Sequence, residues 1–221
     1  MNFFIANDQG NAFTVKLFLV RHGQTDWNIN RRFQGQSDVP LNEAGRQQAT
    51  ALANSLSREH IDVLFASDLQ RAYETARIIA TQHACEIRLD SRLREINFGA
   101  WEGLTYDEIK HNDPAVLAAR EADIFTTAAP DGETLNQLTA RVESVLNDLH
   151  AQYADQTTLI VAHGGPLQIL LCLALDLSPS KYWQFHLATA SLSEIAFYPA
   201  GAIINLMNDT CHLSSLPVGE K

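Results

Sequence analysis

Cysteine is scarce in this chain. Its 221 residues include three cysteines, which are odd in number and far apart: Cys85, Cys172 and Cys211. A disulfide framework needs an even set at regular spacings and a zinc knuckle needs close pairs, so neither is expected. Free thiols suit a reducing compartment, and we therefore expect a cytoplasmic location.

Long apolar runs and an excess of basic charge are also missing. No run approaches the length that spans a bilayer, and the first residues lack the basic flank and apolar segment of a signal peptide. Asp and Glu number 26 against 16 Lys and Arg, for a formal net charge of −10. Such a field repels polyanions, so we expect no nucleic-acid and no membrane partner. A phosphate substrate would need local arginines to bind it against the overall charge.

What is present is the composition of an ordinary globular protein, with 46% apolar and 19% charged residues. Repeats and low-complexity segments are absent, and the length fits one domain over residues 1–221. Both a monomer and a homodimer are compatible with the sequence. Residues 1–14 and the tail after Asn208 have no interpretable pattern.

Strand-like and helix-like segments alternate along the chain, which favours a mostly parallel sheet covered on both faces. We therefore predict a three-layer α/β/α sandwich. A small cap insertion is expected at about 91–133, where the pattern is irregular. The predicted strands are 16–21, 62–66, 86–89, 157–162, 190–198 and 202–206, and the predicted helices are about 42–57, 67–81, 134–151 and one from Pro166.

Short motifs predict where helices begin. Ser67 with Gln70, and Thr105 with Glu108, have the spacing of capping boxes. Asp113-Pro114 predicts an N-cap followed by a proline at the first helical position, and Pro166 is expected to occupy the same position in a later helix.

Polar groups collect where predicted strands end. Arg21-His22-Gly23 follows the first strand, and His163-Gly164-Gly165 follows a later one. Because parallel strands end at one sheet edge, the two histidines can converge there. Taken singly, a strand-end histidine is usually structural, Arg71 near a helix start is usually a solvated residue, and Glu95 is a surface carboxylate. Together they supply a nucleophile, fixed cations and an acid–base group.

The ordered motifs resemble those of the histidine phosphatase superfamily, also called the phosphoglycerate mutase-like family. The match covers about residues 16–175, and its later part looks like the small phosphatase branch. The motifs are Arg21-His22-Gly23-Gln24-Thr25 with Trp27-Asn28, Arg32-Phe33-Gln34-Gly35, Pro40 to Gly45, Ser67 to Ala72, Glu95 to Gly103, Asp131 to Thr134 and Val161 to Gly165.

This resemblance implies that His22 attacks phosphorus and forms a phosphohistidine. For attack, one ring nitrogen must be unprotonated while a backbone carbonyl holds the other. Arg21, Arg71 and a protonated or donating His163 would surround the phosphoryl oxygens. The implied substrate-binding residues are Thr25, Asn28, Gln34, Gly35 and Gly164, the last through a backbone amide at a helix N-terminus. No metal and no cofactor are implied.

Glu95 would be the general acid for the leaving oxygen and then the base for water. That role needs a raised pKa, which we expect desolvation around Phe98 and Trp101 to supply. Glu102 is the weaker alternative, because its place between Trp101 and Gly103 suits a loop anchor.

The sequence is compatible with several activities. We favour hydrolysis of a small phosphate ester, with α-ribazole 5′-phosphate as one candidate, because the predicted cap is compact and acidic beyond Arg120 (Glu121, Asp123, Asp131 and Glu133). The alternatives are a mutase of the phosphoglycerate type and a noncatalytic phosphate-binding module. A metal hydrolase is disfavoured, because close-spaced ligands such as His-x-x-x-His are absent and the flanking arginines would repel a cation.

Overall fold

A six-stranded sheet forms the centre of the computed structural model, which describes residues 15–214 and 216. The order is β3-β2-β4-β1-β5-β6, in which the first four strands are parallel, β5 pairs antiparallel with β1, and β6 pairs antiparallel with β5. The bounds are β1 Val15–Arg21, β2 Val63–Ala66, β3 Ile87–Leu89, β4 Thr157–Ala162, β5 Leu192–Tyr198 and β6 Gly201–Asp209. The expected mostly parallel sheet is confirmed, and the last two predicted strands, 190–198 and 202–206, correspond to the antiparallel pair β5 and β6.

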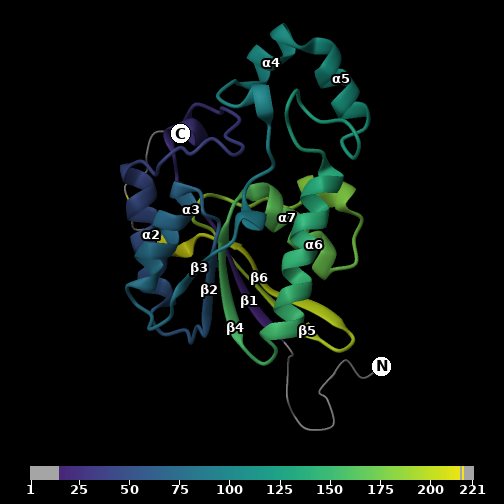
Figure 1. Ribbon diagram of the computed structural model, residues 1–221. Helices are drawn as coiled ribbons and strands as arrows, with labels where there is room; N and C mark the ends of the chain where they lie inside the picture. Colours follow the sequence, from purple (N-terminus) through teal and green to yellow (C-terminus); the bar gives the residue numbers. More distant parts are fainter. Residues whose placement is uncertain (1–14, 215, 217–221) are drawn as a thin grey trace.

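Helices cover both faces of the sheet, which confirms the three-layer arrangement (Figure 1). On one side lie α2 (Glu43–Leu56) and α3 (Gln70–Ala80), whose apolar stripes pack on alternate residues of β1, β2 and β4. On the other side lie α6 (Leu135–Gln152) and α7 (Gly164–Ala174), which pack on the remaining residues of these strands and on β5. Strand residues are therefore buried on both faces, as in parallel sheets generally.

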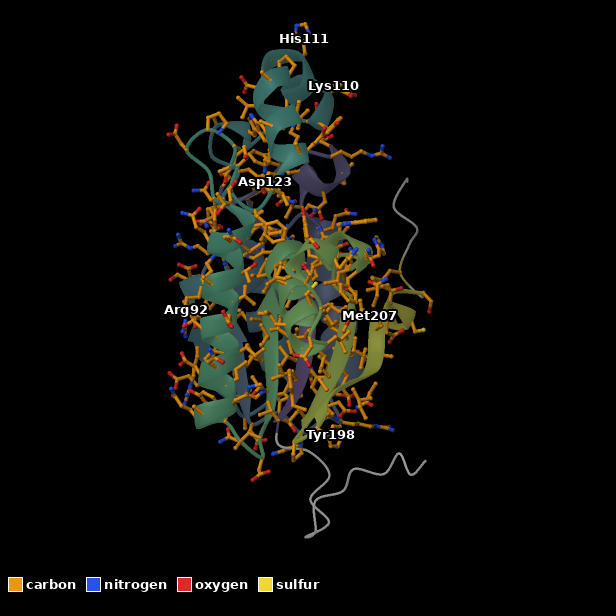
Figure 2. The ribbon with its side chains drawn as sticks, turned by 90° about the vertical axis from the view of Figure 1, so that its right-hand side faces the viewer. Arg92, Lys110, His111, Asp123, Tyr198 and Met207 are labelled. Atoms are coloured by element: carbon orange, nitrogen blue, oxygen red, sulfur yellow. The ribbon has the colours of Figure 1, made fainter. Side chains whose placement is uncertain are left out.

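Between β3 and α6 the chain leaves the sheet and builds a cap, here residues 90–134, above one end of the strands (Figure 1). It holds α4 (Tyr106–Asn112), α5 (Pro114–Ala122) and two 3₁₀ turns, Ser91–Leu93 and Gly99–Trp101. The cap has an apolar centre of its own, made of Trp101, Ile109, Leu117 and Ala129. Lys110 and His111 project from its tip, away from the sheet (Figure 2).

Two of the four helix-start motifs act as predicted. Thr105 and Glu108 form a reciprocal capping box at α4, and Pro114 is the first residue of α5. The prediction of a capping box at Ser67 and Gln70 is wrong. Helix α3 begins at Gln70 with Leu69 as its N-cap, and Ser67 lies in the β2–α3 connection. Pro166 is not at the first position either, since α7 already begins at Gly164. In both cases tertiary contacts at the sheet edge decide where the helix begins.

Smaller elements complete the chain. A single helical turn, α1 (Asp26–Ile29), follows β1 in a stretch for which the sequence predicts only a loop. The turns Pro179–Gln184 and Cys211–Leu213 follow α7 and β6. Among the residues that the structure describes, no helix combines the length and the apolar character required to cross a membrane.

Two glycines bring the loop after β1 against the start of α2. A Cβ on Gly45 would lie 2.1 Å from the carbonyl oxygen of Gln24, and one on Gly23 would lie 2.5 Å from the carbonyl oxygen of Gly45. Both obstacles are backbone atoms, which a rotamer change cannot relieve. The loop that follows His22 is therefore held by a close backbone-to-backbone contact.

We expect Gly45→Ala to lower the free energy of unfolding by about 1–2 kcal/mol in urea denaturation. Alanine gains at most about 1 kcal/mol in helix propensity, while overpacking costs roughly 1–3 kcal/mol. The control is Gln47→Ala, on the exposed side of the same helix, which should stay within about 0.5 kcal/mol of the unmodified protein. Equal stability of the Gly45 and Gln47 variants would contradict the close contact.

Candidate active site

Strand register brings the two strand-end histidines together. Arg21 of β1 is the partner of Ala162 of β4, so the next residues, His22 and His163, leave the sheet side by side. Their ring centroids are 5.1 Å apart. The predicted convergence of the two histidines is therefore present in the fold.

His22 is buried in the tautomer that a nucleophile requires. Its Nδ1–H donates to the carbonyl oxygen of Gly23 at 2.7 Å, as expected, so Nε2 keeps its lone pair. Burial lowers the pKa of His22 well below its ordinary value, and the guanidiniums of Arg71 and Arg21 lower it further. The ring is thus neutral at physiological pH.

Arg71 is fully buried and bonded on three sides. Its Nη1 donates to the Ser37 carbonyl at 2.8 Å, its Nη2 to the Gly35 carbonyl at 2.7 Å, and its Nε to Nδ1 of His163 at 3.2 Å. Burial lowers the pKa of Arg71 to about 10, against an opposing effect of Glu95, so the side chain stays charged. The residue is a fixed cation rather than the solvated one that its position alone would suggest.

His163 was expected to be protonated, or at least to donate, when phosphate is bound. Nδ1 accepts from Arg71, and Nε2 lies 2.9 Å from Oγ of Ser67, an arrangement that fits a neutral ring donating through Nε2. Burial lowers the pKa of His163 well below its ordinary value, and Arg71 adds to the effect. The donating ring agrees with the second of the two expected forms, and protonation of His163 with phosphate bound stays a prediction. Ser67 is the hydrogen-bond partner that the sequence misassigned as a helix cap.

Arg21 is the last residue of β1 and directly precedes His22. Its Nη1 donates to the Leu187 carbonyl at 2.6 Å. Its buried Nε has no hydrogen-bond partner within residues 15–214 and 216. Burial lowers the pKa of Arg21, whereas the nearby Glu95 carboxylate raises it. A buried donor of this kind is normally satisfied, and an anion oxygen would satisfy it.

The turn α1 presents Asn28 to the site. Thr25 caps the turn, and the Asn28 Oδ1 accepts from both the backbone N–H and the hydroxyl of Thr25 at 2.9 and 3.0 Å. The Thr25 hydroxyl also lies 3.0 Å from Oε1 of Gln34. Thr25 is completely buried, so it supports Asn28 and Gln34 from beneath and is not itself in contact with the pocket.

Gly35 and Glu102 shape the loop opposite His22. Gly35 has φ of +52°, and a Cβ there would lie 2.0 Å from the Glu102 carboxylate. That carboxylate accepts from the Gln36 N–H at 2.7 Å and from the Ser37 hydroxyl at 2.6 Å. The prediction of Glu102 as a loop anchor is confirmed, and the Gly35 carbonyl accepts from Arg71.

Glu95 reaches the site from the base of the cap. Its Oε1 accepts from the backbone N–H of Ile96 at 2.9 Å and of Gly165 at 3.0 Å. The carboxylate of Glu95 thus has polar backbone partners, which differs from the apolar surroundings expected from Phe98 and Trp101. Trp101 instead lies inside the cap centre, where its Nε1 donates to Asp113. Gly164 adjoins both Glu95 and Arg21, since a Cβ on it would lie 3.6 Å from the carboxylate and 3.9 Å from Nε of Arg21.

These residues surround a pocket of about 250 Å³. Of the expected site residues, Arg21, His22, Asn28, Gln34, Gly35, Arg71 and Glu95 line it, whereas His163, Thr25 and Gly164 lie behind that lining. The remaining lining residues are Arg31, Arg32, Phe33 and Phe98. Four arginines thus face one carboxylate, which makes the pocket a local cationic site in an acidic protein.

Sequence reasoning missed three supporting residues. Thr75 accepts from the Gly23 N–H at 3.1 Å, and Arg141 donates to the Glu95 carbonyl at 2.9 Å. Neither has a local signal, because each partner is distant in the chain. Ser67 did have a signal in the sequence, because it follows β2 at the same sheet edge as His22 and His163. Within the part of the chain that the structure describes, no three His, Cys, Asp or Glu side chains are grouped so as to hold a metal ion.

The depressed histidine pKa values predict how stability changes with pH. A group that titrates lower in the folded state binds fewer protons than it does unfolded, so its contribution is complete above about pH 6.5 and declines below it. We expect His22→Gln to reduce the slope of unfolding free energy against pH, between 6.5 and 5, by up to about 1.4 kcal/mol per pH unit. Urea denaturation across this range measures it.

His111→Gln is the matched control for that slope, because His111 projects from the tip of the cap (Figure 2). If the His22 and His111 variants changed the slope equally, His22 would not be held neutral by its surroundings.

Comparison with known proteins agrees with this geometry. A family model for the histidine phosphatase superfamily (branch 1) matches residues 17–210. Phosphoserine phosphatase 1 of Hydrogenobacter thermophilus is 35% identical over 204 residues, covering 92% of this chain and 97% of that protein. Probable phosphoglycerate mutase GpmB of Enterobacter sp. is 34% identical over 211 residues, covering 93% and 98%.

Solved structures are similar over the same span. The alpha-ribazole phosphatase of Shigella flexneri superimposes with a TM-score of 0.82 at 27% identity, covering 88% of this chain and 96% of that one. Motifs, fold and site geometry thus agree with the family match, and the chain belongs to the histidine phosphatase superfamily, branch 1.

Proposed function

We propose that this protein is a metal-independent phosphomonoesterase that hydrolyses small phosphorylated metabolites through a phosphohistidine at His22. The observation that carries the proposal is the state of His22: a buried, neutral imidazole whose Nδ1 is held by a carbonyl and whose Nε2 faces a pocket between two fixed arginines. A purely structural histidine has no need of that combination.

In the first half of the reaction, Nε2 of His22 attacks phosphorus and the ester oxygen leaves. Arg71, fixed by two carbonyls, and Arg21, with its unsatisfied Nε, neutralise the charge on the phosphoryl oxygens. The leaving oxygen takes a proton from the Glu95 carboxyl group. The products are an alcohol and phosphohistidine.

In the second half, the Glu95 carboxylate removes a proton from water, which attacks the phosphohistidine and releases inorganic phosphate and neutral His22. The backbone donors of Ile96 and Gly165 suit this step, because they fix the direction of the Glu95 side chain. Arg141 and Gln36 both donate to the Glu95 carbonyl, at 2.9 and 3.2 Å, and hold the residue in place.

Hydrolysis is favoured over mutase chemistry by the cations of the cap. Arg92 and Arg94 are paired with Asp148 and Asp68, and Lys110 projects from the cap tip (Figure 2). That leaves Arg120, which lies 5.5 Å over the ring of the pocket residue Phe98, as a single arginine of the described cap beside the site. A mutase must retain a doubly phosphorylated intermediate, which requires cap cations directed at the site. The pocket volume of about 250 Å³ suits a small metabolite as the substrate. Alpha-ribazole 5′-phosphate remains one candidate, supported by the similar structure from Shigella flexneri.

The purified protein is expected to hydrolyse p-nitrophenyl phosphate in the presence of EDTA, and His22→Ala is expected to lose at least about 10³-fold in kcat/KM. Brief incubation with ³²P-labelled substrate followed by alkaline quenching should label the unmodified protein at an acid-labile site and leave His22→Ala unlabelled. Folding of the variant is checked by circular dichroism.

Different failures identify the alternatives. Loss of activity in EDTA that added metal restores would indicate a metal hydrolase, and binding of phosphate without turnover would indicate a binding module. With 3-phosphoglycerate and a trace of bisphosphoglycerate, formation of 2-phosphoglycerate faster than free phosphate would indicate a mutase.

Glu95→Gln should affect substrates according to their leaving groups. An alkyl oxygen needs a proton when it departs, whereas p-nitrophenolate does not, and general acid catalysis contributes about 10²–10⁴-fold. We expect kcat/KM, which reports the first half-reaction, to fall at least about tenfold more for an alkyl phosphate than for p-nitrophenyl phosphate. Glu121→Gln, in the cap, is the charge-matched control. Equal losses on both substrates would show that Glu95 is not the proton donor.

A further inference from the structure

The four arginines of the pocket differ in how they are held. Arg21 donates to the carbonyl of Leu187, and Arg71 donates to the carbonyl of Gly35. Arg32 donates to the Gly103 carbonyl at 2.5 Å and forms an ion pair with Glu108 at 3.1 Å. Arg31 also lines the pocket, yet its exposed side chain has no hydrogen bond or ion pair to any residue among 15–214 and 216. Apart from the Nε of Arg21, which faces the proposed phosphoryl group, the guanidinium of Arg31 is therefore the part of these four arginines without a partner among the described residues.

The backbone at Arg31 is in an unusual conformation for an arginine. Its φ is +51°, in the left-handed region that glycine and asparagine adopt more readily. The Arg31 N–H donates to the Asn28 carbonyl at 3.3 Å, which closes the turn α1. The turn does not require an arginine at position 31. The presence of arginine there, despite the strained backbone, therefore points to a role of its side chain.

Arg31 follows closely in the chain on Asn28, a residue at the phosphate end of the pocket. It lies one helical turn beyond Asn28, whose side chain is aligned by Thr25 and lines the same pocket. Asn28, His22, Arg21 and Arg71 would contact the phosphoryl group, whereas Arg31 is at the exposed rim. A substrate that extends from His22 toward the rim therefore meets the guanidinium of Arg31 in the lining of the same pocket.

We infer that Arg31 is a specificity-determining residue that binds a carboxylate on the leaving-group side of the substrate, so that the preferred substrates are small phosphorylated carboxylic acids. This inference rests on the proposed phosphomonoesterase function and adds the substrate class. One unpaired guanidinium suits a single monoanionic carboxylate, which it can bind with two parallel hydrogen bonds. A second phosphate would carry more charge than this one exposed cation can balance.

The experiment compares substrates that differ mainly in the carboxylate. O-phosphoserine is paired with O-phosphoethanolamine, and 3-phosphoglycerate with glycerol 1-phosphate, and kcat/KM is measured for each. The unmodified protein should prefer the carboxylated member of each pair by about tenfold, the effect of one hydrogen-bonded charge pair. Arg31→Gln and Arg31→Gly should bring both ratios close to one, mainly through KM.

The two variants guard against a folding artefact, because glycine accommodates the left-handed backbone that glutamine must adopt under strain. Arg58→Gln removes the same charge from an exposed residue outside the pocket lining and should leave the ratios unchanged. Hydrolysis of p-nitrophenyl phosphate by the unmodified protein tests the proposed function separately.

Three results would overturn the inference while p-nitrophenyl phosphate is still hydrolysed. The first is an unmodified protein without preference for the carboxylated member of either pair. The second is a preference that persists in both Arg31 variants or disappears equally in Arg58→Gln. The third is a higher kcat/KM for α-ribazole 5′-phosphate, which has no carboxylate, than for both carboxylated substrates.

Discussion

The buried guanidinium of Arg71 is the interaction on which the site depends. It joins three parts of the chain: α3, the loop carrying Gly35 and Ser37, and His163 at the end of β4. A charge without water is tolerated only when its donors are satisfied, so these partners cannot move independently. Burial lowers the pKa of both neighbouring histidines, and the charge of Arg71 adds to that effect. The proposed phosphoryl-binding arginine and the neutral state of the proposed nucleophile are thus linked through one buried side chain.

The parallel sheet supplies the rest of the arrangement through register alone. Residues that follow β1, β2 and β4 leave at the same edge, which gives His22, Ser67 and His163 adjacent places without any direct sequence relation. Around them, groups that do not touch the pocket hold those that do. Thr75 fixes Gly23, Thr25 aligns Asn28, and Arg141 holds the backbone of Glu95.

Periodicity and motif order were sufficient to predict the layered fold, its strands and the convergence of His22 and His163, because these follow from local pattern and parallel-sheet geometry. The protonation of His163, the partner of Ser67 and the polar surroundings of Glu95 were not predictable, since each depends on a contact with a residue distant in the chain. The turn α1 was missed for a different reason: one capped turn is too short to show helical periodicity.

The separate apolar centre of the cap has an evolutionary consequence. Trp101, Ile109, Leu117 and Ala129 pack with one another, while Phe98 belongs both to this group and to the packing beneath it. The cap reaches the pocket through Phe98, over whose ring Arg120 of α5 lies at 5.5 Å, so substitutions in α5 can alter this wall of the pocket without disturbing the anchors of Arg71 or the tautomer of His22. A family built in this way can diverge in the metabolites it accepts while the phosphoryl-transfer machinery stays the same.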